Sequence, residues 1–151
     1  MIVLDANVFA KLFVEERNSD FARALMYAVQ YSAVPVRLPS LFTYELVQIG
    51  RYHGLDANQV LDLLETQFLS NWKMAEPTRG HWAVAQKISE NGNLKSGYPA
   101  MYDSVYHAMA IEGRGNFITA DKKHYVKAQS FGSIYLLEDW KEPLEPYRTS
   151  N

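Results

Sequence analysis

Four acidic residues stand where a folded α/β chain can bring them together, and they are Asp5, Glu45, Asp103 and Asp121. The first and the last follow short apolar or β-prone runs at residues 2–4 and 116–119. The other two lie near the start of apolar helical segments, one turn inside for Glu45 and in the first turn for Asp103. Strand carboxyl ends and the helix starts that follow them share one edge of a parallel sheet. We therefore expect all four carboxylates to face one crevice.

Clustered carboxylates repel one another, and such a cluster is tolerated mainly when cations neutralise it. The chain contains no Cys, which excludes thiolate metal sites, thiol nucleophiles and disulfides. Hard oxygen ligands without thiolates favour Mg²⁺ or Mn²⁺ over zinc. Metal ions held in this way activate a water molecule and stabilise the charge that builds on a phosphate during hydrolysis of a phosphodiester bond. The pattern therefore predicts metal-dependent phosphodiester chemistry without a nucleophilic side chain.

The elements that must position these acids alternate between strands and helices. We expect strands at residues 2–4, 34–38, 72–75, 116–119 and 133–137, and helices at 6–15, 21–29, 41–54, 57–69, 79–90, 101–112 and 122–129. No Asn-Gly or Asp-Gly hairpin separates two strand-like runs. This order predicts an α/β fold: a single three-layer domain with a mostly parallel central sheet and helices on both faces. We expect the domain to span residues 1–138, followed by an acidic, Pro-containing tail at 139–151.

Length and composition indicate one globular, soluble domain. The 151 residues are 48% hydrophobic, and 15 Lys and Arg against 17 Asp and Glu give a net charge of −2. Global charge therefore does not indicate a nucleic-acid partner, so any such binding must use a local patch. The amino-terminal run lacks a basic segment and is interrupted by Asp5, and no apolar run approaches the roughly 20 residues of a membrane span. We expect a cytoplasmic protein without a membrane association.

Four sequence blocks together resemble the motifs of PIN-domain ribonucleases, especially the VapC-type toxins of prokaryotic toxin–antitoxin pairs. The blocks are LDANVFAKLF, SLFTYELVQ, YDSVYHAMA and FITADKKHY, and they cover nearly the whole chain in order. The resemblance implies a metal-dependent endoribonuclease that forms a homodimer and is inhibited by a small antitoxin. It implies that the residues matching the motif acids bind Mg²⁺ or Mn²⁺, with two polar residues supporting the site: Asp5, Glu45, Asp103 and Asp121, supported by Asn7 and Thr119.

One departure from the family pattern follows the last motif acid. Many relatives carry a further acid there, whereas this chain has Lys122, Lys123 and His124. This difference leaves open whether one or two metal ions bind. The basic residues that are candidates for holding RNA phosphates near the acids are Lys11, Arg114, Lys122, Lys123 and Lys127. The same residues equally suit an ordinary solvated face.

Several alternatives remain at this point. Asp5 and Asp103 each suit a helix cap, Glu45 suits a solvated helix position, and His107 suits either a ligand role or a buried histidine bonded to backbone. A catalytically silent RNA- or protein-binding module and a housekeeping RNA-processing nuclease are the competing functions. A haloacid dehalogenase-like phosphatase is disfavoured, because it requires a second Asp where Asn7 stands. The candidate dimer surfaces are the apolar and aromatic segments at residues 44–52 and 57–68.

Overall fold

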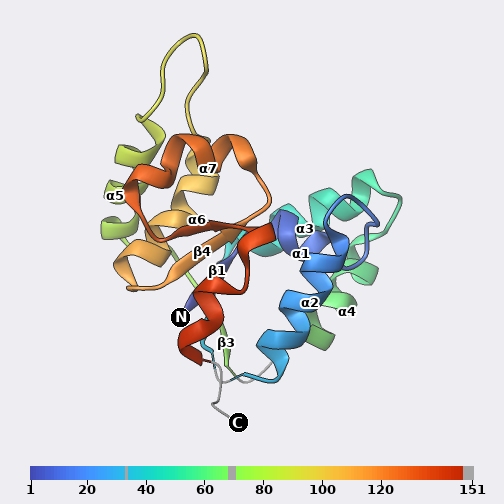
Figure 1. The fold of residues 1–151 in the computed structure, drawn as a ribbon. Helices are drawn as coiled ribbons and strands as arrows, with labels where there is room; N and C mark the ends of the chain where they lie inside the picture. The colour runs from blue at the N-terminus through green and yellow to red at the C-terminus, as the bar shows by residue number, and fades with distance from the viewer. Residues whose placement is uncertain (33, 68–70, 148–151) are drawn as a thin grey trace.

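The fold is built on a parallel sheet, in a computed structural model that describes residues 1–32, 34–67 and 71–147. Within these ranges five strands pair in the order β3-β2-β1-β4-β5, and every pairing is parallel (Figure 1). The strands are β1 (Ile2–Leu4), β2 (Val36–Pro39), β3 (Trp72–Ala75), β4 (Asn116–Thr119) and β5 (Ile134–Leu136). The expected parallel α/β sheet is thus confirmed.

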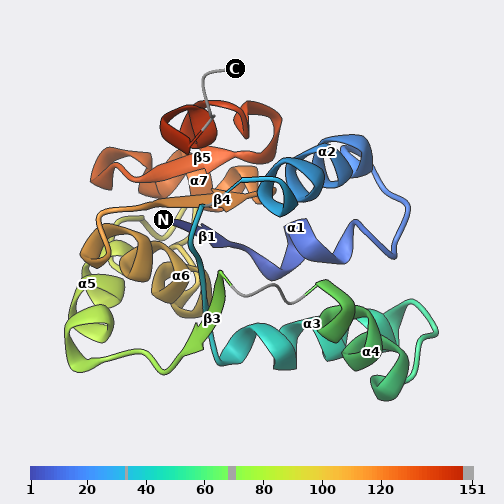
Figure 2. The same ribbon diagram turned by 90° about the horizontal axis from the view of Figure 1, so that it is seen from below.

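Helices cover the sheet in two groups. From β1 the chain steps to β2 and β3 in one direction, and then crosses to β4 and β5 in the other. Right-handed crossovers place the connections of these two directions on opposite faces. Figures 1 and 2 accordingly show α5 to α7 apart from α1 to α4. The helices are α1 (Ala6–Ala10), α2 (Ser19–Gln30), α3 (Leu41–Tyr52), α4 (Ala57–Gln67), α5 (Arg79–Ser89), α6 (Met101–Glu112) and α7 (Lys122–Ala128), with short 3₁₀ helices at Gln129–Phe131, Leu137–Asp139 and Glu142–Tyr147.

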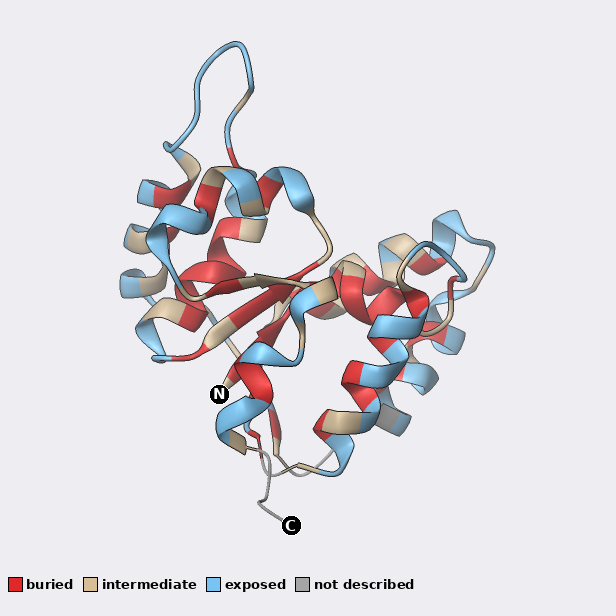
Figure 3. Cartoon of the chain, in the orientation of Figure 1, coloured by how far each residue is buried: buried red, intermediate tan, exposed pale blue. Residues whose placement is uncertain are grey.

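The central strand β1 lies in the hydrophobic core. Its residues Ile2, Val3 and Leu4 are all 0% exposed, as Figure 3 shows by the red colour of the strands. A strand covered by helices on both faces carries a continuous apolar run rather than an alternating one. The burial of all three residues explains why this run predicts a strand.

Local sequence signals set several element ends where we expect them. Strands β3 and β4 have the predicted bounds. Helix α4 begins with the reciprocal bonds of a capping box, because the Gln59 N–H donates to Asp56 Oδ1 at 3.0 Å and the Asp56 N–H donates to Gln59 Oε1 at 2.9 Å. Thr78 caps α5 in the same way. The predicted continuation of α4 through Phe68 and Leu69 falls outside the described residues.

Helix α1 is shorter than predicted, because it ends at Ala10 instead of continuing to residue 15. The next turn tightens, with the Leu12 and Phe13 N–H groups bonded to carbonyls three residues back. Ser19 then fixes the chain, because its hydroxyl oxygen accepts the Glu16 N–H at 2.9 Å. This turn redirects the chain into α2. The apolar residues whose spacing predicts one longer helix therefore lie partly in α1 and partly in the turn that follows it.

The segment after residue 138 packs against the domain up to Tyr147. Leu144 is 4% exposed, and Trp140 and Tyr147 lie against the core. The amino-terminal ammonium group of Met1 hydrogen bonds to the Tyr147 hydroxyl. Packing therefore extends beyond residue 138, the domain boundary expected from composition.

Among the helices in the described ranges, none combines the length and the apolar character needed to cross a membrane.

Helices α3 and α4 pack closely at Gly50, and this contact yields a stability prediction. A Cβ atom on Gly50 would lie 2.3 Å from Val60 Cγ2, and Val60 is 1% exposed. We expect Gly50→Ala to lower the free energy of unfolding by about 1–3 kcal/mol in chemical denaturation. The matched control is Gly80→Ala in α5, where an added Cβ atom would lie 3.5 Å from its nearest neighbours. This variant should raise the free energy of unfolding by up to about 1 kcal/mol. Equal effects at both positions would contradict this packing account.

Candidate active site

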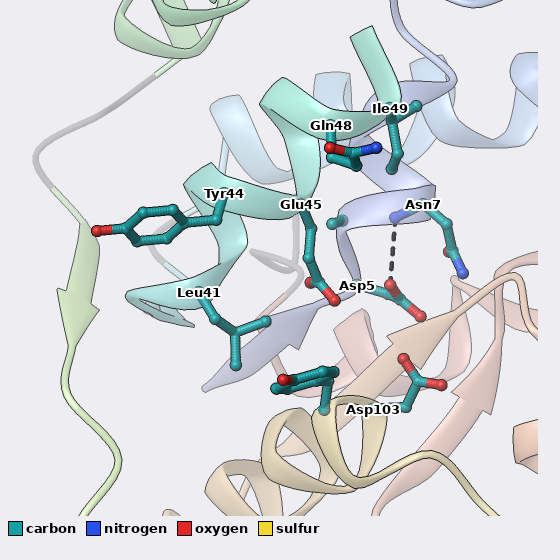
Figure 4. Close-up of a pocket in the computed structure, with 10 residues that line it drawn as sticks. Asp5, Asn7, Leu41, Tyr44, Glu45, Gln48, Ile49 and Asp103 are labelled. Carbon is teal, nitrogen blue, oxygen red and sulfur yellow. Dashed lines mark hydrogen bonds between the residues drawn. The ribbon is translucent and has the colours of Figure 1, made fainter. Parts of the chain in front are cut away.

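Three of the predicted acids line one cavity of about 570 Å³ at the carboxyl edge of the sheet. Figure 4 shows Glu45 reaching down from α3 and Asp103 reaching up from α6, with Asp5 at the end of β1 between them. The sheet reverses its stepping direction between β1 and β4. Ligand sites of open α/β sheets form at such a point, outside the strand ends. The topology thus places the acids where such folds bind ligands.

Asp5 is held in place by hydrogen bonds to both carboxylate oxygens. Its Oδ1 accepts the Asn7 N–H at 3.1 Å, and its Oδ2 accepts the Thr119 hydroxyl at 2.5 Å. Asp5 is 4% exposed and Thr119 is 0% exposed. The hydrogen bond from the Asn7 N–H also caps the amino end of α1. Asp5 is therefore both a helix cap and a residue of the candidate site.

Asp121 lies beside this group and is joined to it through Thr119. Its backbone N–H donates to Thr119 Oγ1 at 2.9 Å, the same oxygen that hydrogen bonds to Asp5. One carboxylate oxygen, Oδ1, caps α7 by accepting the Lys123 and His124 N–H groups at 2.7 and 3.1 Å. Asn7 makes a second link across the edge, because its side-chain Oδ1 accepts the Ala120 N–H at 3.2 Å. Asn7 and Thr119 therefore bridge the ends of β1 and β4.

Three of the four acids, Asp5, Glu45 and Asp103, have raised pKa values. Burial, together with the charges of Glu45 and Asp121, raises the pKa of Asp5 from its usual 3.8 to about 6. Burial, together with the charges of Asp5 and Asp121, raises the pKa of Asp103 to about 7. The pKa of Glu45 is also raised, first by burial and then by the charge of Asp103. The structure therefore brings together all four acids that the sequence predicts.

The donor chemistry of this cluster fits a hard divalent cation. Its facing groups are carboxylates, and the pKa values of Asp5 and Asp103 are raised first by burial and then by the charges of neighbouring carboxylates. Across the described residues, no group of three or more acid or histidine side chains is arranged so that it could hold a metal ion by itself. Mg²⁺ does not require one, because it commonly keeps several waters and takes one or two carboxylates. Asp5 and Asp103 are the residues best placed to bind such an ion, with Glu45 and Asp121 beside them.

A second cavity, of about 500 Å³, lies on the Asp121 side and is rich in basic residues. The predicted candidates Lys11, Lys122 and Lys123 line it. Lys11 is 8% exposed and pairs with Glu16 at 2.9 Å, and Lys122 pairs with Glu138 at 2.8 Å. Lys123 is exposed and makes no ion pair with any residue that the structure describes. The most available predicted cation near the acids is therefore Lys123.

The structure separates the other two basic candidates from this cavity. Arg114 follows the carboxyl end of α6, at the opposite sheet edge from Asp103, because the nine helical steps from Asp103 to Glu112 span about 14 Å. Lys127 turns toward the loop before α6, and its Nζ lies 3.4 Å from where a Cβ of Gly97 would stand. Helical geometry, which a count of basic residues ignores, explains both placements.

His107 does not face the acids. It is 0% exposed, and its Nε2 lies 2.6 Å from the Gly132 carbonyl oxygen. Its ring stacks on Phe117, with the centroids 6.0 Å apart. Of the two readings of His107, the structure supports the buried histidine bonded to backbone. Burial accordingly lowers its pKa.

Two residues that the sequence does not single out contribute to the site. The Tyr106 hydroxyl donates a hydrogen bond to Glu45 Oε2, although 61 positions separate the two residues. Tyr106 is 0% exposed and lies three residues after Asp103, on the same side of α6. Arg17 is exposed and lines the basic cavity with Lys123. The helical spacing from Asp103 was the available signal for Tyr106, while nothing local marks Arg17.

The raised acid pKa values predict an unusual dependence of stability on pH. Between about pH 4 and 7 the folded protein binds more protons at Asp5 and Asp103 than the unfolded chain does, so this contribution to stability is lost as the pH rises. In EDTA at pH 8, Asp103→Asn should therefore raise the free energy of unfolding, by on the order of 1 kcal/mol. At pH 4 the difference from wild type should vanish. Denaturant unfolding at both pH values checks this, and a difference independent of pH would contradict it.

The bond between Tyr106 and Glu45 yields a second prediction. Tyr106→Phe removes the hydroxyl but keeps the ring that packs on Phe42 and Phe117. We expect the affinity for Mn²⁺ in titration calorimetry to fall roughly 10-fold, because a residue that orients a ligand has lost its partner. Tyr52→Phe, at the exposed carboxyl end of α3, is the matched control. Unchanged Mn²⁺ affinity in Tyr106→Phe would remove Tyr106 from the site.

Comparison with known proteins is consistent with this geometry. No curated protein matches the chain at a significant level. Among solved structures, FitAcB from Neisseria gonorrhoeae superimposes with a TM-score of 0.68 at 19% identity, covering 92% of this chain and 99% of that one. VapBC2 from Rickettsia felis, solved bound to a DNA fragment from their promoter, gives 0.61 at 16% identity, covering 90% and 97%. At such identities the likeness concerns the fold. The sequence pattern of the PIN domain, however, matches residues 2–129, and the chain therefore belongs to the PIN domain family.

Proposed function

We propose that this protein is a metal-dependent endoribonuclease that hydrolyses phosphodiester bonds in RNA with Mg²⁺ or Mn²⁺. The observation that carries the proposal is the convergence of carboxylates at the carboxyl edge of the sheet, where Asp5, Glu45 and Asp103 line one cavity and have raised pKa values. PIN domains are generally nucleases and generally use divalent metal ions, which supports the same chemistry. The proposal that RNA is the substrate rests on the resemblance of the four sequence blocks to the motifs of PIN-domain ribonucleases.

Each residue of the site has a part in this proposal. Asp5, Asp103 and Asp121 bind the cation, and Glu45 binds it or orients the attacking water. The bound cation would supply a polarised phosphate and a water of lowered pKa. Thr119 and Asn7 hold Asp5 at a fixed angle through their hydrogen bonds. Pre-set orientation of this kind avoids the need to reorganise side chains during the reaction.

The basic cavity positions the substrate backbone. Lys123 and Arg17 are exposed at its rim, next to Asp121. Phosphates on either side of the reacting one can be held there by charge, in a manner that weakens with salt. Lys122 contributes less, because its ammonium group is paired with Glu138. The acidic cavity would thus hold the cation at the reacting phosphate, and the adjacent basic cavity would hold the neighbouring phosphates of the RNA backbone.

We further propose that the protein is the toxin of a toxin–antitoxin pair, that a small antitoxin protein inhibits it, and that it is a homodimer. The resemblance to VapC-type toxins supports all three, and the fold likeness to VapBC2 is in line with it. Exposed Tyr52 on α3 and Leu63 on α4 provide apolar surface for a dimer contact. Phe68, in the predicted surface, lies outside the described residues. Sedimentation as a monomer at micromolar concentration would count against the dimer.

The proposal is tested by incubating purified protein with a mixed pool of structured RNAs, in Mg²⁺, Mn²⁺ or EDTA. We expect cleavage only with metal, and we expect Asp103→Asn to lower its rate by at least about 100-fold. Asp62→Asn, at an exposed position of α4, is the matched control and should cleave like wild type. Full activity of Asp103→Asn would remove the site assignment.

The same assay separates the competing functions. Metal-independent RNA binding without cleavage of any RNA would favour the silent binding module, an alternative supported by Lys122, Lys123 and His124 standing where many relatives carry an acid. Cleavage restricted to precursor RNAs would instead favour the housekeeping nuclease. A short reading frame beside the gene, whose product blocks cleavage, would support the toxin.

A further inference from the structure

The cavity beside the acids has an aromatic side that the proposed metal chemistry does not use. Tyr44 on α3 and Tyr102 on α6 both line it, and they are 78% and 63% exposed. Leu41 adds apolar lining on the side of Tyr44, and Ile49 also lines the cavity. Figure 4 shows Leu41 and Tyr44 on one side of the acids and Asn7 on the other. Exposed aromatic rings at the mouth of a cavity offer flat apolar surface to a ligand.

The charge in this cavity argues against an anionic occupant. Its lining includes Asp5, Glu45 and Asp103, whereas no Lys or Arg stands among the described residues that line it. A phosphate placed against Tyr44 would therefore meet negative charge without a cation from the protein. A neutral, planar group avoids this repulsion and can stack on the rings. The aromatic side thus suits a nucleobase, and not the nucleic-acid backbone.

The basic cavity lies on the Asp121 side of the acids, away from the aromatic side. Arg17 and Lys123 line it, together with Ala120, whose N–H donates to the Asn7 side chain. Asn7 in turn lines the aromatic cavity. The acids therefore stand between a side that suits phosphates and a side that suits a base. Adjacent nucleotides of one strand present these two chemistries in sequence.

We propose that Tyr44 and Tyr102 form a binding site for one unpaired nucleobase next to the scissile phosphate. Gln48, one turn after Tyr44 in the same lining, carries an amide that can donate to and accept from the edge of the base. A paired base is stacked on its neighbours and its edge is occupied, so it does not enter. The site therefore selects RNA with an unpaired nucleotide at the cleavage position. This inference rests on the proposed function, because it assigns a specificity to that nuclease.

Fluorescence anisotropy can test the base site separately from cleavage. The protein carries Asp103→Asn, so that the RNA stays intact, and the probes are a labelled 12-mer oligoadenylate and an abasic 12-mer with the same phosphates. We expect the oligoadenylate to bind at least about fivefold more tightly. Tyr44→Ala and Tyr102→Ala should each reduce this preference and leave the affinity for the abasic probe unchanged. Tyr44→Phe and Tyr102→Phe should keep the preference.

Two controls separate stacking from other effects. Tyr31→Ala removes a tyrosine that is 71% exposed and lies outside both cavities, so it should behave like the parent. Lys123→Ala should weaken both probes to the same extent, because charge does not distinguish them. Unchanged affinity for the abasic probe also shows that the alanine variants are folded.

The outcomes distinguish this inference from the proposed function. Wild-type cleavage of RNA, with the base preference retained in both alanine variants, would overturn the base site and leave the nuclease standing. Loss of the preference in the alanine variants alone supports the site, whether or not the wild type cleaves the RNAs tested. Failure of the protein to bind either probe, with no cleavage by wild type, would overturn both.

Discussion

Electrostatic repulsion among four carboxylates is the constraint around which this fold is arranged. Asp5 is almost fully buried, and Glu45 and Asp103 are largely shielded from water, so their charges interact through protein more than through solvent. Left alone, such a cluster destabilises the folded state as the acids ionise. The rest of the chain provides enough packing to hold it, beginning with a central strand that is completely buried. Under the proposed function, the same repulsion is what favours a bound cation.

The parallel sheet brings the four carboxylates to one edge, and hydrogen bonds then fix the orientation of their side chains. Strands β1 and β4 are neighbours although more than one hundred residues separate them in sequence, and their carboxyl ends deliver Asp5 and Asp121. Thr119 then hydrogen bonds to both. The two helix groups on opposite faces bring Glu45 and Asp103 in from either side. Tyr106 connects those two groups through Glu45.

Much of this could be predicted from sequence, because the relevant signals are local. The apolar run of β1, the capping box at Asp56 and the Thr78 cap each depend on neighbours within a few residues. The four acids could be predicted to share one site because each stands beside a strand or a helix start that is recognisable in the sequence. The family resemblance adds the expectation that they act together.

What sequence could not provide depends on three-dimensional distance. The end of α1 is set by a turn that Ser19 stabilises, and apolar spacing does not encode it. The basic side chain of Arg114 makes it a candidate for phosphate binding, whereas the length of α6 places it at the opposite edge of the sheet from Asp103. The pairing of Lys11 with Glu16, the bond from Tyr106 to Glu45 and the exposure of Tyr44 beside the acids are likewise visible only in the folded chain.

The central claim is that these carboxylates bind a divalent cation together, and a crystal soaked in Mn²⁺ tests it most directly. Anomalous scattering locates manganese without reference to activity or to the RNA. The account predicts an anomalous peak in the crevice, with Asp5 and Asp103 as ligands and Glu45 and Asp121 bound directly or through water. Manganese bound only elsewhere, with these four carboxylates unliganded at millimolar Mn²⁺, would contradict it.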